Sequence, residues 1–212
     1  MRTQVIATAD PKAIKMAVQL LKAGGLVAFP TDTVYGVGAY AFLPRAVERI
    51  YHVKGRPLNR PIPLLLDSAE SLPQVARDIG PEAWLLTKKF WPGALTLVLH
   101  RKPVVPDIVT AGGPTVALRV PDHAFTLRLI RAVGAPLATT SANLTGHPDP
   151  QIAQDVVDYL EGRINLVLDG GRCPGGIPST LIDLTRTPPL VLRPGAVSRK
   201  ELEEELDCLL QH

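Results

Sequence analysis

The sequence predicts an α/β protein with one twisted, mixed β-sheet and helices packed against it. Three observations lead to this fold class. Short apolar runs typical of buried strands alternate with stretches of helical periodicity along the whole chain. The 21 prolines and 17 glycines are spread through the chain and do not gather in a linker. At 212 residues, of which 46% are hydrophobic, the chain is long enough to bury a sizeable core as one domain, 1–212.

The first helix is predicted from its end signals and its apolar spacing. Asp10 is the expected N-cap, Pro11 the first helical residue, and Gly24 the residue that ends the helix. The expected buried stripe of helical period consists of Ile14, Val18 and Leu21.

The later elements follow in alternation. Helices are expected over residues 44–53, 81–91, 123–133, 151–160 and from Ser198 on. Asp122 is the predicted N-cap of the third of these, and Ser198 with Glu201 forms a capping box for the last. Strands of β-branched and apolar residues are expected over residues 26–29, 62–66, 94–100, 115–120, 136–140, 164–169, 180–184 and 190–193.

Composition and the absence of known motifs narrow the range of possible functions. A net charge of +3 with a pI near 9.0 suits a local basic pocket better than a surface that coats nucleic acid. Cys173 and Cys208 have no CxxC spacing, so neither a disulfide framework nor a zinc site is indicated, and a reducing cytoplasm is the expected location. No membrane span or secretory signal is recognisable. P-loop, Rossmann, HExxH and GxSxG motifs are also missing, which argues against the enzyme classes that use them.

A rigid basic segment, "KGRPLNRPIP", occupies residues 54–63. Arg56 can grip carboxylate or phosphate oxygens with two N–H groups, and Lys54 adds a compact charge. Arg60 can reach the same anion only if the prolines fold the segment back. A solvated loop after a helix and a preorganised anion clamp are both open interpretations.

Hydroxyl groups cluster in "FPTDTVYGVGA", where Thr31, Asp32, Thr33 and Tyr35 follow a buried strand. Such groups can hydrogen-bond a small polar ligand, although the local pattern favours a plain turn between two strands. A second cluster, "ATTSANLTGHPDP", could present backbone groups to phosphate or ribose, or could be a simple strand-to-helix loop.

Thr115 and Arg119 lie four residues apart on a predicted strand, so both should face the same side. A half-buried arginine is ordinarily explained by a structural salt bridge. The alternative is a substrate carboxylate, which would leave the guanidinium unpaired and ready for ligand in the free protein. Ser179, Thr180 and Arg193 also flank predicted strands, and this repetition favours one shared pocket.

Seven short motifs occur in the order and spacing of one known family. They are "PTDTVYGVGA", "KGRPLNRPI", "FWPGALTLVL", "TVALRVP", "TSAN", "PSTLIDL" and "LRPGAVS". By these motifs the chain, from about residue 13 to 198, resembles the YrdC/TsaC family, the L-threonylcarbamoyladenylate synthases. The resemblance implies a YrdC/RibB-like α/β fold with a large concave basic face. It also implies an enzyme, a nucleotidyltransferase that joins L-threonine, bicarbonate and ATP into threonylcarbamoyl-AMP and pyrophosphate, for threonylcarbamoyladenosine modification of tRNA.

The resemblance also assigns site residues. L-threonine would be held by Thr33, Arg119, Thr139 and Ser179. ATP would be held by Arg56, Arg60, Thr115, Ser141, Asp149 and Arg193. Lys54 and Arg56 would be the catalytic charge stabilisers. Mg²⁺ would arrive with ATP and be held mainly by its phosphates, without a metal site on the protein.

Two departures from the family pattern are visible. Leu65 stands where some members have a histidine that contacts threonine, so threonine would be held without it. Larger members add a linker and a second domain, whereas this sequence stops at His212, so no second domain is expected. The alternative function is a non-catalytic module that binds double-stranded RNA or tRNA on the same basic concavity. The expected downstream partner of the synthase is the threonylcarbamoyltransferase machinery.

Overall fold

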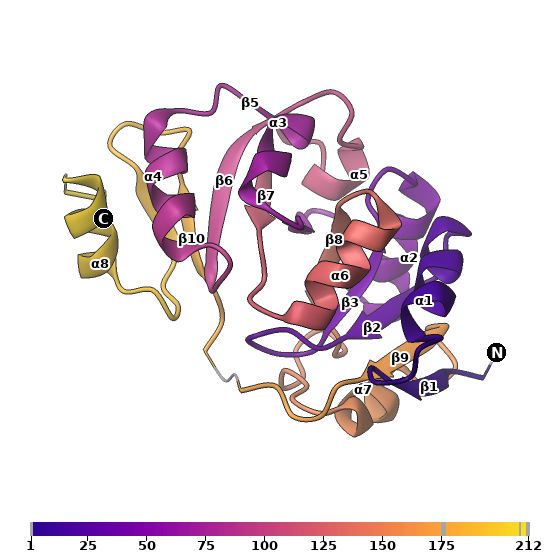
Figure 1. Ribbon diagram of the computed structural model, residues 1–212. Helices are drawn as coiled ribbons and strands as arrows, with labels where there is room; N and C mark the ends of the chain where they lie inside the picture. Colours follow the sequence, from indigo (N-terminus) through magenta and orange to yellow (C-terminus); the bar gives the residue numbers. More distant parts are fainter. Residues whose placement is uncertain (1, 175–176, 208, 211–212) are drawn as a thin grey trace.

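The computed structural model describes residues 2–174, 177–207 and 209–210, and one eleven-stranded sheet runs through them (Figure 1). Its strands are β1 (Gln4–Ala7), β2 (Val27–Phe29), β3 (Gly36–Tyr40), β4 (Leu64–Leu65), β5 (Ala76–Arg77), β6 (Leu95–Arg101), β7 (Thr115–Arg119), β8 (Leu137–Ser141), β9 (Leu166–Asp169), β10 (Thr180–Asp183) and β11 (Leu190–Arg193). Its helices are α1 (Ala13–Lys22), α2 (Pro44–Lys54), the 3₁₀ turn η1 (Ala69–Ser71), α3 (Leu72–Val75), α4 (Pro81–Phe90), α5 (Asp107–Thr110), α6 (Ala124–Val133), α7 (Ala153–Leu160) and α8 (Arg199–Leu206).

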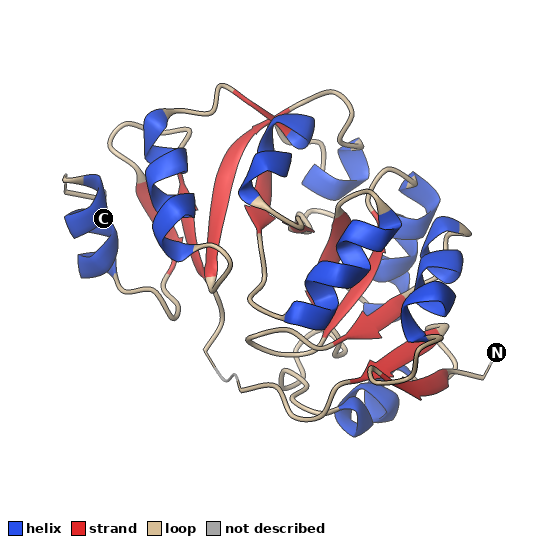
Figure 2. Cartoon of the chain, in the orientation of Figure 1, coloured by secondary structure: helices blue, strands red, loops and turns tan. Residues whose placement is uncertain are grey.

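The sheet is mixed, which confirms the predicted fold class. Its strand order is β1-β9-β2-β3-β8-β4-β7-β6-β10-β11, and β5 pairs with β6 outside this row. The sheet contains parallel pairs, such as β1–β9 and β6–β10, and antiparallel pairs, such as β3–β8 and β6–β7. Figure 2 shows α4 and α8 at the β10 end of the sheet and α1 and α6 near β2, β3 and β8. The concave basic face stays a prediction.

Two apolar clusters cover the two faces of the sheet. Leu64 and Leu65 are adjacent on β4, yet Leu64 packs in the larger cluster and Leu65 in the smaller one, because successive side chains of a strand point to opposite faces. The smaller cluster contains the buried sides of α1 and α6. The larger cluster contains those of α2, α3, α4 and α7. No helix in the described ranges is both long and apolar enough to cross a membrane.

The first helix differs from the prediction at its start. α1 begins at Ala13, and the Asp10 carboxylate accepts a hydrogen bond from the Lys12 backbone N–H at 2.7 Å in a turn before the helix. Asp10 and Pro11 are therefore not its N-cap and first residue. The fully buried stripe consists of Ala13, Ala17 and Leu21. Ile14 and Val18 are only half-buried, because the small alanines let α1 approach α6 and the sheet closely.

The two other predicted helix caps were right in one case and wrong in the other. Ser198 and Glu201 form the predicted capping box of α8. Asp122 is exposed and does not cap α6. The N-cap is His123, whose Nδ1 accepts a hydrogen bond from the Thr126 backbone N–H at 3.4 Å.

Strand β3 was not predicted from the sequence, because "GVGA" was interpreted as part of a loop. Its glycines are needed because side chains from neighbouring strands lie over them. A Cβ at Gly36 would come within 2.7 Å of Thr139 Cγ2, and one at Gly38 within 2.8 Å of the Phe29 ring. Strand β1, strand β5 and the short helices α3 and α5 were also not predicted.

Candidate functional site

One face of the sheet collects several of the predicted site residues. Thr115 and Arg119 lie on the same face of β7, four residues apart. The registers of β6, β10 and β11 bring Thr96 and Arg193 onto this face as well. The loops before β3, after β8 and before β10 carry the other polar side chains of the candidate site.

Arg119 is held by four contacts within the protein. Its Nε donates to Gly93 O at 2.9 Å and its Nη1 to Thr33 Oγ1 at 3.3 Å. Its Nη2 donates to both carboxylate oxygens of Asp32, at 2.6 and 2.7 Å. Of the two interpretations of Arg119, the structural salt bridge is therefore the one observed, and the guanidinium is not unpaired in the free protein. An arginine that is only 8% exposed needs a counter-charge when no ligand is present, and Asp32 supplies it.

The loop that carries Asp32 is a threonine-capped turn, as the local pattern indicated. Thr31 Oγ1 accepts hydrogen bonds from the backbone N–H groups of Thr33 and Val34, at 3.1 and 3.2 Å, and donates to Val34 O at 2.7 Å. Thr33 Oγ1 lies 3.0 Å from Thr31 Oγ1. The turn thereby directs both Asp32 and Thr33 toward Arg119.

A second group surrounds Ser179. Its Oγ lies 2.8 Å from Thr96 Oγ1. Arg193 donates to Ser179 O from Nε and Nη2, at 3.2 and 2.8 Å, and from Nη2 to Ser179 Oγ at 3.1 Å. Burial lowers the pKa of Arg193, and the positive charge of Arg119 lowers it further. Arg119 and Arg193 are thus two neighbouring cations on one face of the sheet.

A third group joins the end of α2 to the loop after β8. Lys54 is 3% exposed, and its Nζ donates to Ser141 O, to Asn143 O and to Asn143 Oδ1. Ser141 Oγ donates to the same Asn143 Oδ1 at 2.7 Å. Burial lowers the pKa of Lys54 to about 8, and the charge of Arg56 acts in the same direction. Lys54 therefore fixes the backbone of the "TSAN" loop.

Asp149 connects the second and third groups. Its side chain is exposed, and its negative charge opposes the lowering of the pKa of both Lys54 and Arg193. A carboxylate that acts on both cations lies within electrostatic reach of each. These interactions bring residues from α2, β11 and the loop before α7 into one neighbourhood.

The basic segment folds back on itself. Arg60 N–H donates to Pro57 O at 3.1 Å, which closes a turn. Arg56 then donates to Arg60 O at 3.2 Å and to Pro61 O at 2.8 Å, and Tyr51 Oη also donates to Arg60 O at 3.0 Å. Burial lowers the pKa of Arg56, and the like positive charge of Arg60 makes a smaller contribution in the same direction. The segment is therefore folded back, as the convergence of Arg56 and Arg60 on one anion requires, and the Arg56 side chain is held by two backbone oxygens.

Two residues lie deeper than the others. Thr139 is 7% exposed and its Oγ1 donates to Leu137 O at 3.1 Å. Leu65 is 5% exposed, stands opposite Arg119 in the register of β4 and β7, and packs in the smaller apolar cluster. The position where some relatives have a histidine is thus part of the core in this chain.

Three polar residues beside the predicted ones were not assigned to the site from sequence. They are Asp32, Thr96 and Asn143. Asp32 and Asn143 stood in loops already noted for their polar composition, so this composition was the available signal. Thr96 interrupts an apolar strand run, and only the strand order shows that it faces Ser179.

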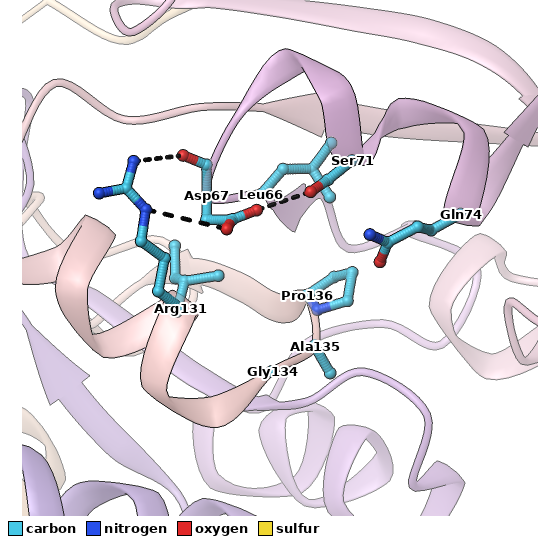
Figure 3. A pocket seen from close by; sticks show the side chains of 9 residues that line it. Leu66, Asp67, Ser71, Gln74, Arg131, Gly134, Ala135 and Pro136 are labelled. Atoms are coloured by element: carbon cyan, nitrogen blue, oxygen red, sulfur yellow. Dashed lines mark hydrogen bonds and ion pairs between the residues drawn. The ribbon is translucent and has the colours of Figure 1, made fainter.

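Two cavities in the structure are lined by residues outside these groups. A small one of about 130 Å³ lies between η1 and α6 (Figure 3). There Ser71 Oγ donates to Asp67 Oδ1 at 2.6 Å, and Arg131 Nε lies 3.9 Å from Asp67 Oδ2. A larger one of about 500 Å³ is lined by Trp84 and Trp91 among others. No predicted site residue lines either cavity.

The fold and the site together define an α/β protein in which fixed arginines, a lysine and hydroxyl groups have the chemistry to hold a small, negatively charged ligand. Comparison with known proteins specifies the class further. Residues 19–195 match the family Sua5/YciO/YrdC, described as "Telomere recombination". The chain belongs to this family.

Two of its relatives are named as enzymes. The chain is 46% identical over 199 residues to the threonylcarbamoyl-AMP synthase of Pyrococcus abyssi, covering 94% of this chain and 58% of that protein. It is 43% identical over 202 residues to the threonylcarbamoyl-AMP synthase of Bacillus subtilis, covering 95% of this chain and 58% of that one. The chain thus spans less than two thirds of the length of these relatives.

A solved structure has the same fold over the whole of this chain. The crystal structure of P. abyssi Sua5 complexed with L-threonine matches with a TM-score of 0.94 and 41% sequence identity. The match covers 100% of this chain and 63% of that one. The arrangement of strands and helices described above is therefore the one this family uses.

Proposed function

We propose that this chain is an L-threonylcarbamoyladenylate synthase. It would join L-threonine, bicarbonate and ATP into threonylcarbamoyl-AMP and release pyrophosphate. The observation that carries the proposal is the match over the whole chain to a Sua5 structure that binds L-threonine, at 41% identity. The curated relatives named threonylcarbamoyl-AMP synthase support the same activity.

The proposed L-threonine site is built around Arg119. Its members are Thr33, Arg119, Thr139 and Ser179. Thr33 contacts Arg119 directly, and Ser179 is bound to Arg193, whose pKa responds to the charge of Arg119. A guanidinium beside hydroxyl groups suits an amino acid that carries both a carboxylate and a hydroxyl.

The proposed ATP site lies beside it. Its members are Arg56, Arg60, Thr115, Ser141, Asp149 and Arg193. The folded-back basic segment supports a role in binding phosphates, because the Arg56 guanidinium is already held by Arg60 O and Pro61 O before an anion arrives. Asp149 lies within electrostatic reach of Lys54 and Arg193, which supports placing these three around one nucleotide.

The chemistry accumulates negative charge at each step. The amine of threonine captures carbon dioxide or bicarbonate as a carbamate, and a carbamate oxygen then attacks the α-phosphorus while pyrophosphate leaves. Such a reaction needs fixed cations and backbone donors and no nucleophilic side chain. Arg56 would stabilise the phosphates directly. Lys54 would act mainly through the "TSAN" loop that it holds, with its charge placed behind the loop.

Magnesium would enter with the nucleotide. Within the part of the chain that the structure describes, no group of three or more His, Cys, Asp or Glu side chains could hold a metal ion. We propose an ion held mainly by the phosphates of ATP, with Asp149 as the carboxylate among the proposed ATP residues. When bound, the ion would offset the charge of the phosphates.

The product would pass to a threonylcarbamoyltransferase that modifies tRNA, and this setting places the proposed reaction in the cytoplasm. The RNA-binding alternative is less well supported. An RNA groove has no need of the hydroxyl and arginine cluster of Thr33, Arg119 and Ser179. Binding of double-stranded RNA that falls steeply with salt and occurs without any reaction would favour the alternative.

Pyrophosphate release from ATP tests the proposed activity. The protein is assayed with ATP, Mg²⁺, L-threonine and bicarbonate, and each of the last two is then omitted in turn. Release is expected only with all of them present. Release that persists without threonine, or no release from the complete mixture, would contradict the synthase.

A further inference from the structure

Asp32 forms a salt bridge with Arg119 but is not among the residues proposed to hold threonine. Three guanidinium nitrogens of Arg119 donate to protein acceptors, and one of them, Nη2, donates to both carboxylate oxygens of Asp32. The side chains are 9% and 14% exposed for Arg119 and Asp32, so the pair is nearly but not fully closed to solvent. A ligand can reach it at one side.

The Asp32 carboxylate has spare capacity. Within the described ranges, both of its oxygens accept hydrogen bonds from one atom, Arg119 Nη2, at 2.6 and 2.7 Å. An ionised carboxylate can accept about four hydrogen bonds. Asp32 can therefore bind a further donor without giving up Arg119.

Electrostatics decides what kind of donor fits. A ligand with a carboxylate alone could neutralise the second cation, Arg193, but it would offer no donor to the Asp32 carboxylate and would add a negative charge near it. A zwitterion brings its own cation. Its carboxylate can lie toward Arg119 and the Ser179–Arg193 group, while its ammonium lies toward Asp32, so that unlike charges alternate.

We propose that Asp32 is a specificity-determining residue that receives the α-ammonium of the substrate, so that the pocket selects α-amino acids over carboxylic acids without an amine. This rests on the proposed function for the location of the pocket. It assigns a role to the acidic residue of "PTDT", which the proposed threonine site leaves without one.

The test compares two ligands on matched variants of the full chain. L-threonine and (R)-3-hydroxybutanoate, which is L-threonine without its α-amine, are titrated by calorimetry into the wild type, Asp32→Asn and Asp183→Asn. Asp183 is the control, because its carboxylate is 9% exposed and also holds an arginine, Arg186, at 3.2 Å. Circular dichroism and thermal unfolding show whether each variant folds.

The expected result is a change in the ratio of the two affinities. The wild type should prefer threonine, and in Asp32→Asn this preference should fall by about tenfold or more, since a charge-assisted hydrogen bond is lost. Asp183→Asn should keep the wild-type ratio. An equal loss for both ligands in Asp32→Asn, or tighter threonine binding, would overturn the assignment.

Two further measurements keep the outcome decisive. If Asp32→Asn does not fold, Asp32→Ser, which admits water to Arg119, takes its place with the same expected ratio. L-serine and L-valine are titrated into the wild type as well. Binding of these without threonine would refute the proposed substrate and leave the role of Asp32 intact, whereas binding of no amino acid would refute both.

Discussion

At the scale of single residues, each buried or half-buried cation of the candidate site is bound by other groups of the same protein. Arg119 is neutralised by Asp32, Arg193 is bound to Ser179, and Lys54 donates to backbone oxygens of the "TSAN" loop. Each cation is fixed before a ligand arrives, which reduces the ordering cost of binding. Lys54 differs from the two arginines because its charge can be lost near neutral pH.

Nucleotide binding should depend on the protonation of Lys54. Burial lowers its pKa to about 8, so the ammonium is present below that pH and is lost as the pH rises through it. ATP affinity measured by calorimetry should therefore fall between pH 7 and 9.5, by about tenfold if one nearby charge is removed from a partly buried site.

Two variants identify the titrating group. Lys54→Met should bind ATP weakly at every pH, without the fall near pH 8. Lys88→Met, which removes an exposed lysine on α4, should keep the wild-type profile. An unchanged pH profile in Lys54→Met would show that another group titrates.

At the scale of elements, strand β3 explains why glycines are needed in the middle of a sheet. Glycine ordinarily weakens a strand, and here neither Gly36 nor Gly38 has a positive φ. The need comes from Thr139 and Phe29, whose side chains occupy the space of the missing Cβ atoms. Strand β3 is therefore set by packing across the sheet between β2 and β8.

Gly36→Ala should destabilise the protein by about 1–3 kcal/mol, because the new Cβ would lie 2.7 Å from Thr139 Cγ2. Thermal or denaturant unfolding measures the loss. In a Thr139→Ser background the clashing methyl group is absent and the nearest remaining atoms are 3.6 Å away or more, so the same change should cost less. An equal cost in both backgrounds would refute this explanation.

At the scale of the whole molecule, the site draws on segments from both halves of the sheet. The loop before β3 and the loop after β8 belong to the half with α1 and α6, whereas Ser179 and Arg193 belong to the half with α4 and α8 (Figure 1). Ligands that contact both halves should therefore stabilise them together.

Hydrogen exchange tests this coupling. ATP with L-threonine at about 100 times their dissociation constants should raise the free energy of unfolding by about 2.7 kcal/mol or more. Exchange should slow in residues 31–35, 141–149 and 193–197 together, and not in residues 200–206 of α8. Protection confined to one half of the sheet would contradict a shared pocket.

The sequence by itself determined most elements, the α/β class and the chemical nature of the site. Local signals suffice for these: Gly24 ends α1, Ser198 and Glu201 cap α8, and the hydroxyl and basic loops are visible in the printed letters. Such signals act within a few residues of one another, and they located the end of α1 and the start of α8 but not the start of α1 or the N-cap of α6.

Only the tertiary structure decided which of these groups meet. Arg119 and its partner Asp32 are 87 residues apart, as are Lys54 and Ser141, and Thr96 and Ser179 are 83 apart. Strand order brings these residues together, and no local pattern encodes strand order. The same holds for the glycines of β3, since packing between strands selects them.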